Sequence, residues 1–257
     1  MRAKDIPEIS VLVLGADGVI DSEKHLFKTP IESILDAAGK TYFSVQLNDN
    51  PSSLQAISDS VFARRIPIIV SGGFADLTAN TDWVNLTGEF LEEAIAAKCP
   101  IFGICFGAQM VFRQFYPDSL VFQCVGEVGE RHLDFIPEAK QTPLASVAGQ
   151  GTYCFHFDGI SWKDEYSEKI TCLAKNQVEG ITVCQAFKVK KLPIYGVQFH
   201  PEFGYQAFCT LISTYADSLK SEHGICAADV ISGLRVHEAY ADTLISFVEV
   251  AKEESHA

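Results

Sequence analysis

The sequence predicts an α/β fold with a doubly wound, mostly parallel central sheet that is flanked by helices. Short apolar runs rich in β-branched residues occur at 9–14, 41–47 and 66–70, and segments with helical spacing lie between them. Runs without a polar face are typical of strands that are covered on both sides. The chain has 257 residues, which is enough for one α/β domain of good size.

The first strand of this pattern, residues 9–14, ends at Gly15 and is expected at the centre of the sheet. The next segment carries a helix start signal. Thr29 is expected as the N-cap, Pro30 as the first helical residue, and Glu32 as the partner that completes a capping box. Gly39 is expected to end this helix.

The remaining elements are expected in the same alternation. Helices are predicted at 52–64 and 83–98, and a buried strand runs from Pro100 to Ile104. Shorter β-like runs between 119 and 150 predict antiparallel strands added at the sheet edge. A strand pair at 169–174 and 181–187, a strand at 194–199, and helices at 206–219 and 227–250 complete the chain.

We expect residues 1–220 to form one domain and residues 221–257 to form a helical extension packed on it. No internal repeat or low-complexity segment is seen.

Cys105 lies between glycines two residues away on either side, Gly103 and Gly107, at the point where a buried strand gives way to a helix. A G-x-C-x-G at this place is typical of a nucleophile elbow, a sharp strained turn in which the glycines avoid Cβ clashes. The positive end of the following helix favours the thiolate. The alternative is a structural cysteine, because free cysteines are often buried.

His200 and Glu202 follow another apolar strand and supply the partners that a catalytic cysteine needs. A nucleophilic thiol requires a base within hydrogen-bond reach, and the base requires a third group that fixes its tautomer. The ring of Pro201 restrains the turn between them.

The segments 103–109 (GICFGAQ) and 196–202 (GVQFHPE) resemble the class I, or triad, glutamine amidotransferases, in the family's order and over residues 8–215. The resemblance implies a flavodoxin-like fold. It also implies that Cys105 attacks the side-chain amide of glutamine and releases ammonia through a γ-glutamyl thioester, with His200 and Glu202 completing the triad.

The pair Gly72 and Gly73 ends the strand at 66–70 and has two interpretations. A pyrophosphate-binding loop of the S-G-G-x-D-S type fits poorly, because Ala75 and Leu77 replace its aspartate and serine. The resemblance instead implies an oxyanion loop, in which the N–H groups of Gly73 and Phe106 face the reacting amide oxygen. The family usually has proline where this sequence has Phe74.

The resemblance also implies substrate-binding residues: Gly72, Gln109, Phe155, His156 and Phe157. His156 could alternatively be the base, but the family places that role in the later His-Pro-Glu segment.

Other folds that contain a nucleophile elbow fit this sequence less well. An α/β-hydrolase has its acid before the histidine, whereas Glu202 follows His200. A relative of the cysteine-elbow chaperones and proteases would lack the late His-Pro-Glu. Three hypotheses remain: a glutaminase that gives ammonia to a separate synthetase, a stand-alone γ-glutamyl hydrolase that acts on a conjugate, and a non-catalytic scaffold.

The composition restricts the kinds of partner that the protein can bind. The net charge of −13 argues against binding to nucleic acid or an acidic membrane.

The cysteines and the absence of further motifs bear on the compartment and on cofactors. The eight cysteines include no C-x-x-C pair, which favours a reducing cytoplasm over a disulfide framework or zinc ribbon. We find no signal-like or membrane-spanning apolar stretch and no G-x-x-x-x-G-K-[ST] loop. We expect no metal and no cofactor.

Overall fold

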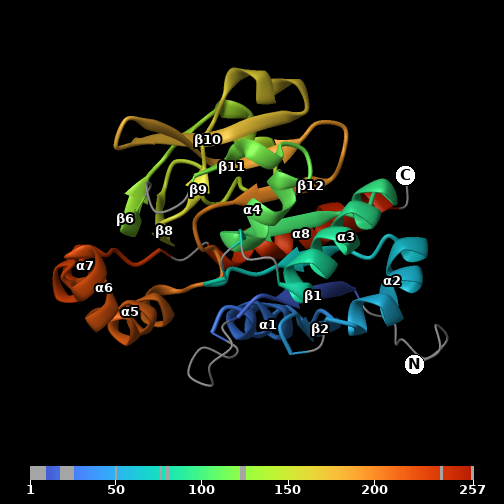
Figure 1. Ribbon diagram of the computed structural model, residues 1–257, viewed down its shortest axis with the longest axis horizontal. Helices are drawn as coiled ribbons and strands as arrows, with labels where there is room; N and C mark the ends of the chain where they lie inside the picture. Colours follow the sequence, from blue (N-terminus) through green and yellow to red (C-terminus); the bar gives the residue numbers. More distant parts are fainter. Residues whose placement is uncertain are drawn as a thin grey trace.

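The computed structural model describes residues 10–17, 26–49, 51–75, 77–78, 81–121, 126–237 and 240–255. The first residue of the expected strand, Ile9, and one of the eight cysteines, Cys124, lie outside the described residues. Figure 1 shows helices on both sides of a central sheet, which confirms the predicted fold class.

The main sheet has eight strands in the order β2-β1-β3-β4-β12-β11-β10-β7. Neighbours from β2 to β12 are parallel, and β11, β10 and β7 continue the sheet as antiparallel strands. The strand bounds are Val11–Gly15 (β1), Tyr42–Gln46 (β2), Ile68–Val70 (β3), Ile101–Ile104 (β4), Asp134–Phe135 (β7), Ile170–Val178 (β10), Ile181–Val189 (β11) and Ile194–Val197 (β12).

The two faces of the sheet belong to two buried clusters, because alternate residues of each central strand point to opposite sides. Phe102 of β4 contacts Phe247 of α8 on one side, where α1 also packs. Ile101 belongs to the cluster on the other side, with α2, α3 and α4. The helix bounds are Lys28–Ala37 (α1), Ser53–Arg64 (α2), Asp82–Ala96 (α3), Phe106–Arg113 (α4) and Tyr240–Ser255 (α8).

The region expected to add edge strands between 119 and 150 is arranged differently. Of the strands that the structure describes in this region, only β7 joins the edge of the main sheet. Leu120–Val121 (β5) pairs with Gly159–Ile160 (β9), and Glu127–His132 (β6) pairs with Gly151–His156 (β8), in two separate two-stranded sheets. Each of these short runs finds its partner later in the chain instead of on the main sheet. Short 3₁₀ helices lie at Pro117–Ser119 and Pro137–Gln141, and a third, Asp164–Glu168, follows β9.

The expected N-cap at Thr29 is wrong. Helix α1 begins at Lys28, and no side chain of the adjacent N-cap residue Phe27 caps it. The carboxylate Oδ1 of Asp17 instead accepts from the backbone N–H groups of Phe27 at 2.5 Å and Lys28 at 3.3 Å. An acidic group from just beyond β1 therefore satisfies the helix start, and the local capping box is not needed.

The chain after the last strand forms further helices. Tyr205–Thr214 (α5), Ala216–His223 (α6) and Ala227–Gly233 (α7) contact one another and lie together at one side of the molecule in Figure 1. Residue 220, the expected end of the main domain, falls inside α6. The division into 1–220 and 221–257 stays a prediction.

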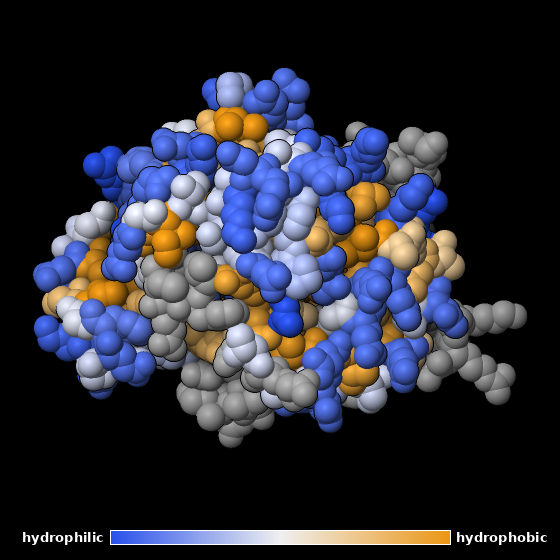
Figure 2. Space-filling model, turned by 45° about the horizontal axis from the view of Figure 1, so that its top comes forward, coloured by the Kyte–Doolittle hydropathy of each residue, from blue (hydrophilic) through white to orange (hydrophobic). Residues whose placement is uncertain are grey.

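The surface is largely hydrophilic over the upper part of the face in Figure 2, with smaller apolar areas between. Within the described ranges, none of the helices is both long and apolar enough to cross a membrane.

We expect Asp17→Ala to lower the free energy of unfolding by about 1 to 2 kcal/mol, because α1 loses the acceptor for its first N–H groups. Urea denaturation measures this. The exposed aspartate of α2, Asp59, is the matched control, and Asp59→Ala should change stability by less than about 0.5 kcal/mol. Equal effects of the two substitutions would contradict the capping role.

Candidate active site

Cys105 occupies a strained turn between β4 and α4. Its φ and ψ are 49° and −107°, an unusual backbone conformation for a residue with a side chain. A Cβ at Gly107 would lie 2.3 Å from the carbonyl oxygen of Val70, and one at Gly103 would lie 2.6 Å from the backbone nitrogen of Ala108. The two glycines are thus required by close packing. Because α4 starts at Phe106, its positive end favours negative charge at Cys105.

His200 and Glu202 lie beside this turn because β12 is the parallel neighbour of β4. Val197 pairs with Ile104, and the backbone N–H of Cys105 donates to the carbonyl of Val197 at 2.7 Å. Three residues later the N–H of His200 donates to the carbonyl of Tyr153 at 2.8 Å, which fixes the chain beyond the strand. Nδ1 of His200 is 2.7 Å from Oε1 of Glu202, and both side chains are fully buried.

The electrostatics of His200 follow from this arrangement. Burial alone lowers the pKa of His200, but the negative charges of Glu202 and Cys105 and the hydrogen bond with Glu202 outweigh burial and raise its pKa from 6.5 to about 10. Nε2 has no hydrogen bond of good geometry within the part of the chain that the structure describes. Since Nδ1 faces Glu202, Nε2 is the atom left to exchange a proton with Cys105. The rings of Phe27 and Phe203 lie 5.5 and 5.3 Å from the imidazole.

The Gly72–Gly73 loop lies next to the elbow. The N–H of Gly107 donates to the carbonyl of Ser71 at 3.2 Å, and Gly73 lines the same cavity as Cys105. A Cβ at Gly73 would lie 2.1 Å from the carbonyl oxygen of Ala16, so only glycine fits there. Gly72 does not line the cavity. Its position is beside His200, where a Cβ would lie 2.9 Å from Cε1 of the imidazole.

A cavity of about 460 Å³ opens at Cys105. Of the residues expected to bind substrate, it is lined by Gln109, Phe155, His156 and Phe157. The two other triad candidates, His200 and Glu202, do not line it. The residue where the family usually has proline, Phe74, is 39% exposed and forms part of the wall.

Gln198 is a site residue that sequence reasoning missed. Its Nε2 donates to Sγ of Cys105 at 3.4 Å, and its Oε1 accepts from Nε2 of Gln109 at 3.1 Å. The same Gln109 nitrogen donates to the carbonyl of Asp158 at 3.2 Å. A usable signal was present, because Gln198 stands in the same short motif as His200, two residues before it.

The outer wall of the cavity comes from the end of α5 and from α6, which sequence reasoning did not connect with the site. Tyr215, Ser218, Leu219, Glu222 and His223 all line the cavity. The His223 imidazole stacks on the Phe157 ring at 3.6 Å, and the Ser218 hydroxyl donates to Glu222 at 2.7 Å. No motif marks these residues in the sequence, because their role depends on how α6 folds back.

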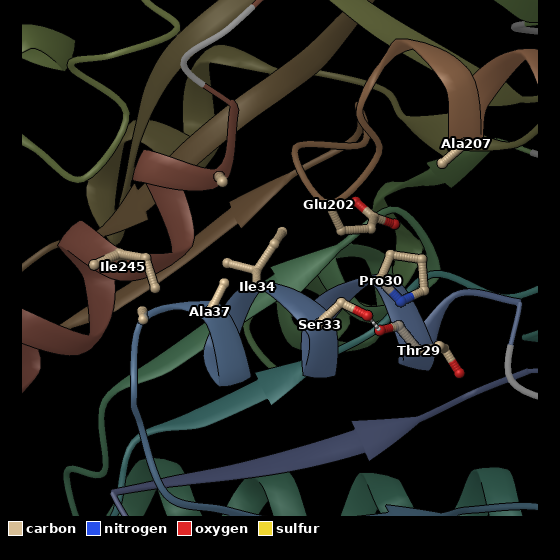
Figure 3. Close-up of a pocket in the computed structure, with 10 residues that line it drawn as sticks. Thr29, Pro30, Ser33, Ile34, Ala37, Glu202, Ala207 and Ile245 are labelled. Atoms are coloured by element: carbon tan, nitrogen blue, oxygen red, sulfur yellow. Dashed lines mark hydrogen bonds between the residues drawn. The ribbon is translucent and has the colours of Figure 1, made fainter.

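A second hollow, of about 570 Å³, lies beside Glu202. Figure 3 shows it between α1, with Pro30, Ser33 and Ile34, and Ile245 of α8. Its lining is largely apolar and excludes Cys105. The smaller cavity is therefore the candidate active site, since it combines a nucleophile with convergent polar groups. Among the described residues, no group of three or more His, Cys, Asp or Glu side chains could hold a metal ion.

Comparison with known proteins agrees with this geometry. Residues 20–212 match the family described as glutamine amidotransferase class-I. The chain therefore belongs to the class I glutamine amidotransferase family, which confirms the resemblance that the sequence motifs indicated.

Two curated relatives are glutamine-hydrolyzing GMP synthases. A subunit of the Methanococcus vannielii enzyme is 28% identical over 56% of this chain and 68% of that protein. The Ehrlichia canis enzyme is 25% identical over 52% of this chain but only 25% of that protein. A glutamine amidotransferase structure from Thermotoga maritima has the same fold, with a TM-score of 0.67, 16% identity, and coverage of 96% of this chain and 99% of that one.

The raised pKa of His200 predicts a pH-dependent stability. A histidine whose folded pKa exceeds its ordinary value stabilises the fold fully below that ordinary value, and the contribution is lost as the pH rises through the folded pKa. The contribution of His200 should therefore be complete below pH 6.5 and disappear as the pH passes about 10.

Urea denaturation of the wild type and His200→Gln between about pH 6 and about pH 10.5 measures this contribution. The difference in free energy of unfolding should shrink as the pH rises. A difference that is constant over the whole range would contradict the assignment.

Proposed function

We propose that the protein is a glutaminase-type amidotransferase with Cys105, His200 and Glu202 as its catalytic triad. The proposal rests mainly on one observation: a thiol on a strained elbow interacts with a buried imidazole that a carboxylate holds at 2.7 Å. This is the arrangement that nucleophilic catalysis by cysteine requires.

In the proposed reaction, the proton of the Cys105 thiol passes to His200 and the sulfur forms a bond to the γ-carbonyl carbon of a glutaminyl group. The N–H groups of Gly73 and Phe106 stabilise the oxyanion, and one such donor is typically worth about 3 kcal/mol of barrier. His200 gives its proton to the nitrogen as the carbon–nitrogen bond breaks, and ammonia leaves. Water then adds to the γ-glutamyl thioester, His200 takes its proton, the carbon–sulfur bond breaks and glutamate is released.

The raised pKa of His200 fits both halves of this cycle. A raised pKa lets His200 hold the proton that it takes from the Cys105 thiol until the leaving group accepts it. Once the thioester has formed, sulfur carries no negative charge, and one of the causes that raise the pKa of His200 is gone. His200 has by then given its proton to the leaving ammonia, and without the charge on sulfur its imidazole stays neutral and can act as the base for the water step.

We further propose that the ammonia is passed to a separate synthetase subunit. The similarity to one subunit of a GMP synthase supports a partner of this kind.

The test is glutamate release from free glutamine by the purified protein. Cys105→Ala should lower kcat by about a thousandfold or more, because the nucleophile is lost. The exposed cysteine of the C-terminal region gives a matched control, and Cys226→Ala should leave the rate unchanged. Activity that survives in Cys105→Ala would rule out the proposed nucleophile.

A second candidate is hydrolysis of a γ-glutamyl conjugate, in which an amine larger than ammonia leaves. The size and wall of the cavity favour it. Phe74, Phe155 and Tyr215 form one aromatic cluster, with ring centroids 4.7 to 5.9 Å apart. A volume of about 460 Å³ lies in the range of pockets that bind ligands larger than an amino acid.

Tyr215→Ala separates the two candidates. If the aromatic cluster contacts a leaving group, KM for a γ-glutamyl dipeptide should rise about fivefold or more while KM for glutamine changes little. Steady-state kinetics with both substrates measures this. An equal rise for the two substrates, or no dipeptide cleavage by the wild type, would exclude the conjugate hydrolase.

A further inference from the structure

A chain of buried polar groups leads from Cys105 to strands outside the cavity. It runs through Gln198 and Gln109 to the carbonyl of Asp158, as described above. The same carbonyl lies 3.0 Å from Nδ1 of His156 on the cavity wall. The position of His156 is thereby coupled to the side chains that contact the sulfur.

The tautomer of His156 follows from this contact. A carbonyl oxygen only accepts, so Nδ1 carries the hydrogen and a neutral imidazole leaves a lone pair on Nε2. Nε2 makes no hydrogen bond within the described ranges and lies 3.5 Å from Oε2 of Glu127. The side chains of His156 and Glu127 are only 2% and 3% exposed, so bulk water does not solvate either group. If Glu127 were ionised, its Oε2 and Nε2 of His156 would both be hydrogen-bond acceptors, and neither could donate to the other.

Glu127 is held in place by three other groups. Oε1 accepts from Nδ2 of Asn176 at 2.7 Å and lies 3.3 Å from Nε of Arg131, while Oε2 accepts from Nε2 of Gln185. These contacts come from β6, β10 and β11, whereas His156 belongs to β8. The carboxyl group is therefore fixed independently of the histidine.

The charges around the pair favour a proton on Glu127. Burial raises the pKa of Glu127, and the contacts with Asn176, Arg131 and Gln185 offset this only in part. Burial, and to a smaller extent the positive charge of His200, lower the pKa of His156 to about 3. The hydrogen bond to the carbonyl of Asp158 raises this pKa but does not outweigh them. The titratable groups that face Glu127 from the described elements are Arg131, Cys154 and His156.

We propose that Glu127 is a positioning residue of the active site, whose protonated carboxyl group donates a hydrogen bond to Nε2 of His156. This bond would hold the segment 156–158 against Gln109. It would thereby fix the position of the cavity wall relative to the sulfur of Cys105. The proposal rests on the proposed function of the cavity, and it assigns Glu127 no contact with substrate.

The test compares Glu127→Gln with Glu127→Ala. A glutamine amide can donate an N–H to Nε2 at every pH once the Gln185 amide turns, so that its unpaired Oε1 faces the new amide nitrogen in place of its Nε2. Alanine leaves Nε2 of His156 unpaired. Glu127→Gln should keep kcat/KM within about twofold of the wild type, and Glu127→Ala should lower it about tenfold, mainly through KM. Any loss of wild-type activity that follows ionisation of Glu127 as the pH rises should be absent in Glu127→Gln.

Glu130→Ala is the matched control on the same strand. Its carboxylate accepts from the N–H of Arg235 at 2.8 Å and pairs with His237 at 3.1 Å, away from the polar chain. This variant should change kcat/KM by less than about twofold even where it lowers the melting temperature.

Nitrogen-15 NMR of His156 supplies a readout that does not depend on turnover. Hydrogen on Nδ1 alone is expected in the wild type and in Glu127→Gln. Hydrogen on Nε2 of the wild type, or a folded Glu127→Gln as impaired as Glu127→Ala, would overturn the proposal. A wild type without glutaminase activity would instead refute the proposed function and leave the tautomer result as the test of Glu127.

Discussion

The parallel pairing of β4 with β12 is the constraint on which the candidate site depends. The two strands are neighbours in register, so their carboxyl ends meet at one edge of the sheet. A cysteine one residue beyond β4 and a histidine three residues beyond β12 are thereby brought together, although 95 positions of sequence separate residues 105 and 200. The hydrogen bond from the Cys105 N–H to Val197 continues this pairing into the elbow itself.

Burial of the His200–Glu202 pair has an energetic cost that the local structure offsets. Taking two charged groups out of water costs several kcal/mol per ion, and good geometry is needed to recover it. The 2.7 Å contact provides that geometry, and the rings of Phe27 and Phe203 keep the surroundings dry. The same low-dielectric setting strengthens the attraction between the imidazolium and a thiolate. The contacts of His200 with Glu202, Phe27 and Phe203 therefore affect both the stability of the fold and the proposed reactivity of the site.

The sequence allowed the fold class and the grouping of Cys105 with His200 and Glu202 to be predicted, because these depend on local patterns. Gly103 and Gly107 are dictated by close backbone approach, and apolar runs identify strands without any knowledge of their partners. Features that depend on distant contacts were missed. Asp17 caps α1 from ten residues upstream, which the residues around Thr29 do not reveal. The pairing of β6 with β8 brings Glu127 to His156, and the return of α6 brings its side chains to the cavity.

The outer wall formed by Tyr215 and α6 has a consequence for how the site of this protein can change in evolution. The groups around the sulfur all precede Gly204, while the cavity's outer boundary is built from residues 215–223. Under the proposed function, reaction and selectivity would be carried by successive stretches of the chain. The α6 boundary meets the rest of the cavity through side-chain contacts such as the stacking of His223 on Phe157. Sequence drift in that one short helix can reshape the entrance while the chemical machinery stays the same.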